Sequence, residues 1–292
     1  MNVLIAGGSG FLGQALTAAL LQQGHQVTVI SRTPDNISAP VQAMRLTDLT
    51  PAHGFDAVIN LTGAGIADAR WSDARKTIMR DSRLHTTQAL IDWINTAQQR
   101  PTVLLSGSAI GWYGAQGETC LTENSPVHAE FVQQLCADWE ACAEQAAALG
   151  VRTVLLRTGV VLDPAGGMIK RVLLPFKLGL GGRLGDGQQW MSWISRHDWV
   201  QAVTFLLTDP TLHGAFNLCS PHPVRNVEFT QTLAGSLSRP AWLPAPAIVL
   251  RMLLGEMSGL LLDSQRVLPQ RLMDVGFQFQ HPRLKVALQN LG

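Results

Sequence analysis

The segment AGGSGFLG, residues 6–13, constrains the fold of this 292-residue chain more than any other stretch. It follows the apolar run NVLIA and leads into a helical pattern from about Gln14. Its glycines satisfy both GxGxxG, at Gly8, Gly10 and Gly13, and GxxGxxG, which starts at Gly7 instead. Between a strand and a helix, such a turn brings backbone close to a pyrophosphate and directs helix N-terminal amides at it, although a glycine-rich turn without a ligand is the alternative. We expect the following residues to bind a dinucleotide: Gly7, Gly8, Ser9, Gly10, Phe11, Leu12 and Gly13.

Short apolar runs alternate with longer helical patterns through the first half of the chain. The apolar runs are NVLIA, QVTVI, DAVINL, TVLLS and VRTVLLR, and the longer patterns include a helix that ends near Ala97 and one from about Glu130 to Leu149. This alternation predicts a parallel sheet with helices on both faces. We therefore expect an α/β fold, a Rossmann-type doubly wound sheet, over residues 1–160.

After Arg157 the chain becomes rich in glycine and proline, as in LDPAGG, LGLGGRLGDGQQ and SPHPVRN. Such segments form loops, and the tail from about Leu237 carries only short helical patterns. We expect residues 161–292 to form a smaller C-terminal substrate lobe over the carboxyl ends of the strands, where open α/β sheets bind ligands, with some segments returning to the sheet.

The end of the second strand predicts which dinucleotide is bound. Sites that prefer NAD place Asp or Glu there to hold the ribose 2′-hydroxyl, but this chain has Ser31 and Arg32. An arginine pairs with a 2′-phosphate, and the serine hydroxyl adds a hydrogen bond. We expect NADP(H), with a solvated strand-end charge as the alternative reading of Arg32.

Two further segments are candidates for cofactor contacts. Leu61, Thr62 and Gly63 end the strand DAVINL and bring backbone to the same edge of the sheet. In the helix that follows, helical spacing places Lys76, Arg80 and Arg83 on one stripe. We interpret Lys76 and Arg80 as a solvated basic face. Arg83 either belongs to that face or points inward to the pyrophosphate or ribose of the cofactor.

Composition limits the partners of the chain. Lys and Arg total 22 against 21 Asp and Glu, so no global charge favours nucleic acid or an anionic membrane surface. The four cysteines lack CxxC spacing, which indicates free thiols and no metal site. The most apolar late segment, AIVLRMLLGEMSGLLL, is interrupted by Arg251 and Glu256, too often to span a bilayer. We expect a cytoplasmic protein with a small-molecule substrate, without a signal for a particular oligomeric state.

Several ordered motifs resemble a known family. AGGSGFLG, SRTP, DAVINLTG, SGSAIGWYG, LRTGVVL and WISRHDWV resemble the extended short-chain dehydrogenases/reductases. ADARW, SRLHTTQ, FVQQLCADWE, LPFKLGLGGRLGDGQQWMSWI and PQRL…GFQF are similar to an atypical branch, the epimerase-family proteins labelled as predicted nucleoside-diphosphate-sugar epimerases, which carry their own C-terminal domain. The resemblance covers nearly the whole chain and implies cofactor contacts from Ser31, Arg32, Leu61, Thr62, Arg83 and Val160. It implies no particular reaction, because this branch is defined by fold more than by substrate.

The resemblance also shows what this chain lacks. In active extended enzymes a serine or threonine near the end of the fifth strand polarises the substrate, and Ser108 matches it, with a strand-end hydrogen bond as the alternative role. A tyrosine about 25 residues later, with a lysine four residues further on, moves the proton, but here those positions fall near Phe131 and Leu135. Four nearby residues could transfer the proton in place of the pair: Glu130, Glu140, His128 and Cys136. For each of them the alternative is an ordinary surface or packing role.

The remaining candidates belong to the substrate pocket. Tyr113, the only tyrosine, matches a pocket-lining residue of the family, and a packed loop aromatic is the alternative. The glycine-rich lobe segment adds Arg183 for an anionic group and Trp193 for stacking, and a second loop adds Arg225. At least two of Trp190, Trp193 and Trp199 are expected to be core residues.

These features lead to two hypotheses. One is an NADP(H)-dependent oxidoreductase or sugar-nucleotide epimerase-like enzyme, with Ser108 as the catalytic residue. The other is a non-catalytic NADP-binding redox sensor or scaffold protein, which the missing Tyr and Lys favour.

Overall fold

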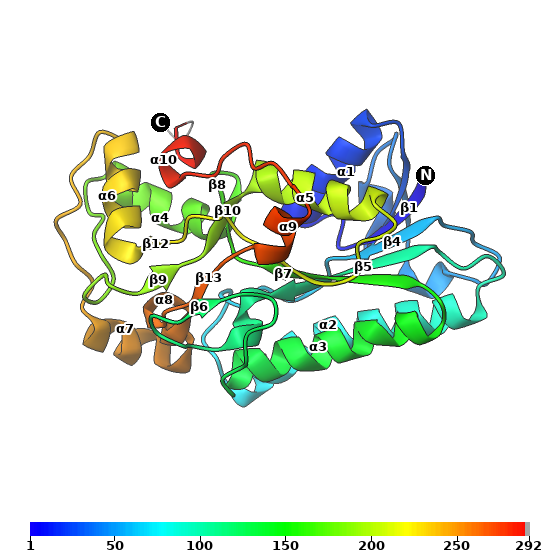
Figure 1. Ribbon diagram of the computed structural model, residues 1–292, viewed down its shortest axis with the longest axis horizontal. Coiled ribbons are helices and arrows are strands. Elements are labelled where there is room, and N and C mark those ends of the chain that lie inside the picture. Colours follow the sequence, from blue (N-terminus) through cyan, green and yellow to red (C-terminus); the bar gives the residue numbers. More distant parts are fainter. Residues whose placement is uncertain (290–292) are drawn as a thin grey trace.

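The computed structural model describes residues 1–289 of the chain. At its centre lies a seven-stranded parallel sheet with the order β11-β7-β5-β4-β1-β2-β3 (Figure 1). Its strands are β1 (Asn2–Ala6), β2 (Gln26–Ile30), β3 (Gln42–Met44), β4 (Ala57–Asn60), β5 (Val103–Ala109), β7 (Arg152–Thr158) and β11 (Gly214–Leu218). The predicted α/β fold with a Rossmann-type doubly wound sheet is confirmed.

Helices cover both faces of this sheet (Figure 1). On one face lie α1 (Phe11–Gln22) and α5 (Arg196–Thr208), and on the other lie α2 (Asp73–Thr96) and α3 (Phe131–Ala148). Val3 and Ile5 of β1 pack toward the first face, while Leu4 and Ala6 pack toward the second. Because strand side chains alternate between the faces and both faces are covered, the strand reads as a continuous apolar run.

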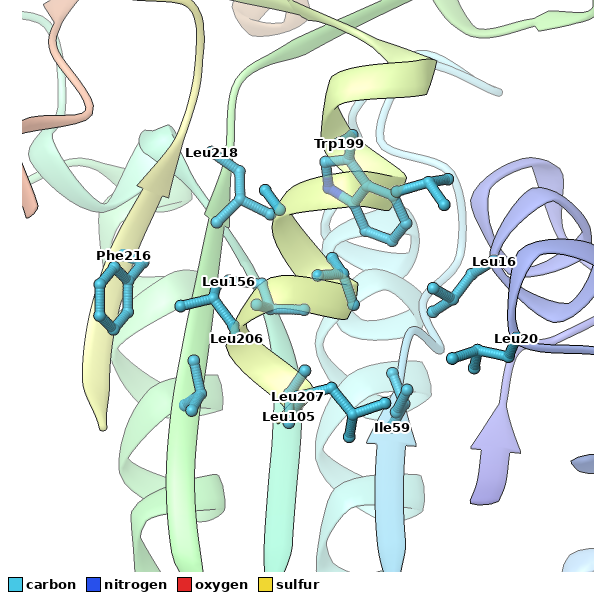
Figure 2. Close-up of a cluster of buried hydrophobic side chains, with 14 of the residues drawn as sticks. Leu16, Leu20, Ile59, Leu105, Leu156, Trp199, Leu206, Leu207, Phe216 and Leu218 are labelled. Atoms are coloured by element: carbon cyan, nitrogen blue, oxygen red, sulfur yellow. The ribbon is translucent and has the colours of Figure 1, made fainter. Parts of the chain in front are cut away.

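Figure 2 shows the core on the side of α1 and α5. Leu16 and Leu20 of α1 and Trp199 of α5 meet Ile59 and Leu105 from the sheet, and all five are completely buried. Each such side chain contributes roughly 1.5–3 kcal/mol by leaving water. The expectation that at least two of the three tryptophans are core residues is confirmed, because Trp193 is also fully buried.

The sequence patterns placed five of the seven strands to within a few residues, and β3 and β11 were not predicted. Strand β1 coincides with NVLIA, and α3 has Glu130 and Leu149, the predicted ends, as its caps. Helix α1 begins at Phe11, three residues before the expected start at Gln14. The glycines of the turn hide this start, because Gly13 lies inside the helix but has the composition of a loop.

A smaller lobe lies beyond the carboxyl ends of the strands, at the left of Figure 1. Its helices are α4 (Gly167–Lys177), α6 (Asn226–Ser236), α7 (Ala247–Leu254), α8 (Gly259–Leu262) and α10 (Leu284–Ala287). Helix α9 (Gln270–Asp274) packs instead against β11 of the large sheet. Short strands form three two-stranded sheets: β8 (Val160–Asp163) with β10 (Trp193–Ser195), β9 (Trp190–Met191) with β12 (Val224–Arg225), and β6 (Cys120–Leu121) with β13 (Arg266–Val267). The 3₁₀ turns of the chain are η1 (Pro34–Asn36), η2 (Leu46–Asp48), η3 (Ile110–Tyr113) and η4 (Gly255–Ser258).

The chain crosses between the two parts more than once. After β8 and α4 it returns through α5 and β11, which pairs in parallel with β7 at the edge of the large sheet. The large sheet therefore takes a strand from beyond residue 160. Among residues 1–289, no helix is long and apolar enough to cross a membrane.

Candidate cofactor and active site

The turn between β1 and α1 requires glycine at defined positions. Gly7 has φ +85, in the left-handed region, and a Cβ there would lie 2.8 Å from the carbonyl carbon of Leu61. A Cβ on Gly13 would lie 2.2 Å from the carbonyl oxygen of Gly7. The turn after β1 thus packs directly against the end of β4. These neighbouring strands lie where the chain reverses its direction of travel across the sheet, the position at which open α/β sheets bind nucleotides.

The N-terminus of α1 is suited to a phosphate. Gly10 caps the helix with extended backbone and supplies no side-chain hydrogen bond, so the first amides keep free donors. Ser9 and Gly10 are exposed, whereas Gly8 is buried, where a Cβ would meet the side chain of Val29 at 2.6 Å. The residues present therefore fit a dinucleotide pyrophosphate.

The end of β2 carries a positive charge without a partner. Ser31 is buried, and its Oγ accepts a hydrogen bond from the amide of Thr33 at 3.1 Å. Arg32 is exposed, and among the described residues its side chain makes no ion pair or hydrogen bond. Its guanidinium is accordingly available for a 2′-phosphate.

The segment after β4 brings Arg83 to the same edge of the sheet. Buried Asn60 orders the turn, since its Oδ1 accepts from Thr62 Oγ1 at 2.6 Å and from the Thr62 amide at 3.1 Å. Arg83 lies over Gly63, where a Cβ would be 2.9 Å from the guanidinium carbon, and it donates to the carbonyl of Ala64 at 3.2 Å. Burial lowers the pKa of Arg83. Of the two roles that the sequence left open, the structure favours the inward position.

A loop of the smaller lobe covers the start of α1. A Cβ on Gly166 would lie 2.3 Å from the ring of Phe11, and the guanidinium of Arg196 lies 5.3 Å from the centre of that ring. Val160, another predicted contact, begins β8 and donates its amide to the carbonyl of Ser192 at 2.9 Å. The lobe thus meets the glycine-rich turn through this loop.

Ser108 belongs to a buried chain of hydrogen bonds. Its Oγ donates to Oε1 of Glu140 at 2.5 Å. Arg157 binds the same carboxylate in bidentate fashion, Nε to Oε1 and Nη2 to Oε2, both at 2.8 Å. All three side chains are buried. Because the Ser108 hydroxyl is committed to a carboxylate, Glu140 controls the direction in which it donates.

Tyr113 lies inside the same chain, so the structure corrects the prediction that it lines a pocket. Its side chain is completely buried, donates to Asn217 Oδ1 at 2.7 Å and accepts from Arg157 Nη1 at 3.1 Å. Burial raises its pKa to about 12. A phenol in this state has no surface to offer a substrate and holds its proton at neutral pH, so the alternative of a packed loop aromatic is correct.

The positions expected for the Tyr and Lys pair differ by one residue from the sequence count. The α3 side chains that approach η3 are Val132 and Cys136, which a Cβ on Gly111 would meet at 2.4 and 3.7 Å. Phe131 packs instead edge-on against Trp71. Burial raises the pKa of Cys136 to about 12, so this side chain stays a neutral thiol near neutral pH. The same four-residue spacing separates Val132 from Cys136, so the sequence also allowed these two positions for the pair.

The other predicted pocket residues lie in different environments. Trp193 is completely buried, and its Nε1 donates to the carbonyl of His222 at 3.1 Å, so its ring is core and not a stacking surface. Arg225 forms an ion pair with Glu118, Nη2 to Oε2 at 2.8 Å. Arg183 alone of the predicted set is exposed. The structure therefore removes Tyr113 and Trp193 from the predicted pocket.

Two open depressions lie elsewhere on the molecule. One of about 560 Å³ lies between α5 and residues 276–280, and one of about 720 Å³ lies beside the amino ends of β7 and β11. Neither is lined by the glycine-rich turn or by Ser108, so neither is the candidate site. Within residues 1–289, no three His, Cys, Asp or Glu side chains are grouped to hold a metal ion.

Known proteins match this chain along its length. Residues 3–219 match the model of the NAD dependent epimerase/dehydratase family, and residues 245–291 match a domain of unknown function, DUF1731. Epimerase family protein Mb2239 of Mycobacterium bovis is 42% identical, with 98% of this chain and 96% of that protein covered. The chloroplastic SDR39U1 homolog of Arabidopsis thaliana is 37% identical, over 99% and 86% of the two chains.

Solved structures agree with these matches. The human epimerase family protein SDR39U1, crystallised with NADPH, is 35% identical and superimposes with a TM-score of 0.91, over 100% of this chain and 99% of that one. A UDP-glucose 4-epimerase from Thermotoga maritima, with UDP-glucose, is 16% identical with a TM-score of 0.79, over 100% of this chain and 97% of that one, which shows the shared fold alone. Carrying the glycine-rich turn at its β1–β4 switch point and the C-terminal domain of these relatives, this chain belongs to the NAD dependent epimerase/dehydratase family, in the atypical SDR39U1-like branch of the extended short-chain dehydrogenases/reductases.

Proposed function

We propose that the protein is an NADP(H)-dependent oxidoreductase or sugar-nucleotide epimerase-like enzyme. The observation that carries the cofactor choice is Arg32, an exposed guanidinium without a partner in residues 1–289, at the strand end where an NAD site places an acid. The NADPH in the human relative supports the same choice.

In this proposal the predicted cofactor residues hold different parts of the dinucleotide. The first turn of α1 and the glycines before it hold the pyrophosphate, and Arg32 with Ser31 holds the 2′-phosphate. Thr62, Gly63 and Arg83 contact the cofactor at the end of β4, and Val160 reaches it from β8. The nicotinamide would supply hydride transfer.

Ser108 is the proposed catalytic residue, and its geometry defines what it does. Its proton is donated to Glu140, so the lone pairs of Oγ are left for the substrate. Ser108 therefore accepts a hydrogen bond from a substrate hydroxyl more readily than it donates one to a carbonyl. With Val132 and Cys136 facing η3, proton transfer falls to water or to a ribose hydroxyl of the cofactor.

The second candidate is a non-catalytic NADP-binding redox sensor or scaffold protein. The side chains that stand at the positions of the usual pair favour it, because Val132 has no proton to exchange and burial raises the pKa of Cys136 to about 12. A sensor would report the cofactor through contacts between the lobe and the sheet, such as the loop over Phe11.

Calorimetric titration of NADPH and NADH tests the cofactor assignment. The wild-type protein is expected to bind NADPH more tightly, and Arg32→Ala should weaken NADPH binding about 10- to 100-fold, the effect of one charge-assisted hydrogen bond, while NADH binding stays unchanged. Arg251→Ala, an exposed arginine on α7, is the matched control. Equal affinities for the two cofactors, unaffected by Arg32→Ala, would overturn the assignment.

A second measurement separates enzyme from sensor. NADPH consumption with a panel of carbonyl compounds and sugar nucleotides, diminished in Ser108→Ala, supports the enzyme. Absence of turnover across the panel, together with a partner protein that binds only the NADPH-loaded form, would support the sensor instead.

A further inference from the structure

Helix α7 exposes its apolar side chains at the outer end of the smaller lobe, at the lower left of Figure 1. Every residue of this helix except Arg251 is apolar, yet none of them is buried. Ile248, Met252 and Leu253 are 71%, 72% and 66% exposed. Exposed apolar residues of monomeric proteins are normally scattered, and a contiguous group of them marks a site of interaction. Helix α7 thus presents a face that residues 1–289 leave uncovered.

Two loop segments connect this helix with the end of α4 and enlarge the apolar face. The amide of Ala245, just before α7, donates to the carbonyl of Arg183 at 2.9 Å. Earlier in the same two segments, Nε of Arg239 donates to the carbonyl of Lys177 at 3.0 Å. We call the combined surface the lobe-end face, and its most exposed apolar side chains, all at least 64% exposed, are Leu174, Leu178, Trp242, Ile248, Met252 and Leu253.

The charges around the lobe-end face have a single sign. The two segments that form it, residues 164–185 and 237–255, contain no Asp or Glu, although acids and bases are balanced in the whole chain. Among the described residues only Arg171 of these segments forms an ion pair, with Asp68 on the opposite side of the loop. The cations that remain without an ion pair are Lys170, Lys177, Arg183, Arg239 and Arg251.

The outer side of α4 mixes the two kinds of side chain. Lys170, Leu174 and Lys177 are three or four residues apart, so they lie on one side of the helix, and Leu178 follows them. All four residues are exposed. A long lysine side chain lies along apolar neighbours and keeps its ammonium group at a polar boundary. Such a surface suits a partner that is apolar inside and negatively charged at its boundary.

A second copy of the chain does not fit the lobe-end face. A two-fold dimer places the same surface of both copies together, so the unpaired cations would meet like charges. A partner helix has no groove to occupy in the two open depressions, because neither of them is lined by residues of this face. A bilayer with anionic lipids supplies an apolar interior and a negative boundary, and it needs no groove.

We propose that the lobe-end face binds the surface of a membrane that contains anionic lipids. Helix α7 lies in the plane of the membrane with Ile248 and Met252 among the acyl chains, Trp242 lies at the level of the headgroups, and the cations face the lipid phosphates. With eight residues, α7 is too short to cross a bilayer, so the protein lies on the surface. The proposal involves neither Arg32 nor Ser108, so it stands whether or not the protein is catalytic.

Co-sedimentation of the full-length protein with lipid vesicles tests the proposal. Vesicles of phosphatidylcholine with an equal part of phosphatidylglycerol should bind it at low ionic strength, and vesicles of phosphatidylcholine alone should bind it much less. Ile248→Gln should lower the partition coefficient about tenfold through lost apolar burial, and Lys177→Gln about fivefold through lost charge. The controls Ile78→Gln and Lys285→Gln remove an exposed apolar and an exposed cationic side chain outside the face, and they should stay within about twofold of wild type.

Fluorescence gives a second measurement that does not depend on the stability of Ile248→Gln. Anionic vesicles with brominated acyl chains should quench part of the tryptophan emission, and Trp242→Phe should lose that part. The proposal is overturned if the protein does not bind anionic vesicles, in which case an acidic protein surface is the better partner, or if it binds phosphatidylcholine vesicles equally well. It is also overturned if Ile248→Gln and Lys177→Gln bind as wild type does, or if the wild-type protein sediments as a dimer that Ile248→Gln dissociates.

Discussion

At the scale of single residues, the molecule is defined by a buried polar chain that joins Ser108, Glu140, Arg157, Tyr113 and Asn217. Each member bonds to the next at 3.1 Å or less. Buried polar groups of this kind are stable only when every partner is present. The chain therefore combines a structural role for Tyr113 with control over the hydroxyl of Ser108.

Burial of the only tyrosine predicts an unusual titration. Tyr113 has a pKa of about 12 because it is desolvated, so its phenolate should form near pH 12 in the native protein and near pH 10 after unfolding. Since the folded-state pKa is the higher one, the stabilising contribution is complete below pH 10 and is lost as pH rises through 12. Absorbance at the phenolate band measures this directly, and a native transition near pH 10 would contradict the burial.

Removal of the Glu140 carboxylate should destabilise the protein strongly. Glu140→Ala leaves Arg157 charged, buried and unpaired, which is expected to cost about 3–5 kcal/mol in the free energy of unfolding. Glu144→Ala, one turn further along α3 and exposed, should change it by about 0.5 kcal/mol or less. Urea unfolding of the two variants gives the comparison, and equal midpoints would mean that the ion pair contributes nothing.

At the scale of elements, the β1–α1 unit was predicted from its local sequence pattern, but its packing against the rest of the sheet was not. The glycine spacing predicted the turn and the helix, and it remains the basis for expecting the cofactor phosphates at this turn. What it could not supply is the close packing that makes two of the glycines necessary, the approach of Gly7 to Leu61 and that of Gly13 to Gly7. The first of these contacts joins segments more than 50 residues apart, so it follows from the pairing of β1 with β4, whereas the second lies within the turn itself.

Alanine substitutions in two helices test this close packing. Gly13→Ala in α1 should destabilise by about 1–3 kcal/mol and weaken NADPH binding, because the new methyl group collides with the Gly7 carbonyl. Gly235→Ala in α6 meets nothing within 4 Å, so it should be neutral or stabilise by about 0.5–1 kcal/mol through helix propensity. Thermal unfolding with and without NADPH measures both, and a stable Gly13→Ala variant with wild-type NADPH affinity would refute the packing argument.

At the scale of the whole molecule, the C-terminal segment is part of the main fold. Strand β13 pairs with β6, Asn217 donates Nδ2 to the carbonyl of Leu268 at 2.9 Å, and Leu272 is buried in the same cluster as Trp199. The region that matches the domain of unknown function thus completes the core of the sheet domain. Contacts between the two matched regions are extensive.

Truncation after Leu243 should therefore lower the stability of the remaining sheet domain. Loss of the buried side chains of Val267, Leu272 and Phe277 costs roughly 1.5–3 kcal/mol each, which corresponds to a fall in Tm of at least about 10 °C. Circular dichroism on heating gives the Tm of the truncated and full-length chains. An unchanged Tm would show that residues 1–243 fold independently of the rest.

The sequence by itself determined the α/β class, the alternation of strands and helices in the first half of the chain, the glycine-rich turn and the positive charge at the end of β2. These depend on neighbouring residues, through the periods of strands and helices and the conformation of glycine. Only the tertiary structure decided that Ser108 donates to Glu140, 32 positions away, and that Tyr113 reaches Asn217, 104 positions away. The reason is geometric: one residue turns a helix by about 100°, so counting along α3 pointed to Phe131 and Leu135, while packing turned Val132 and Cys136 toward η3.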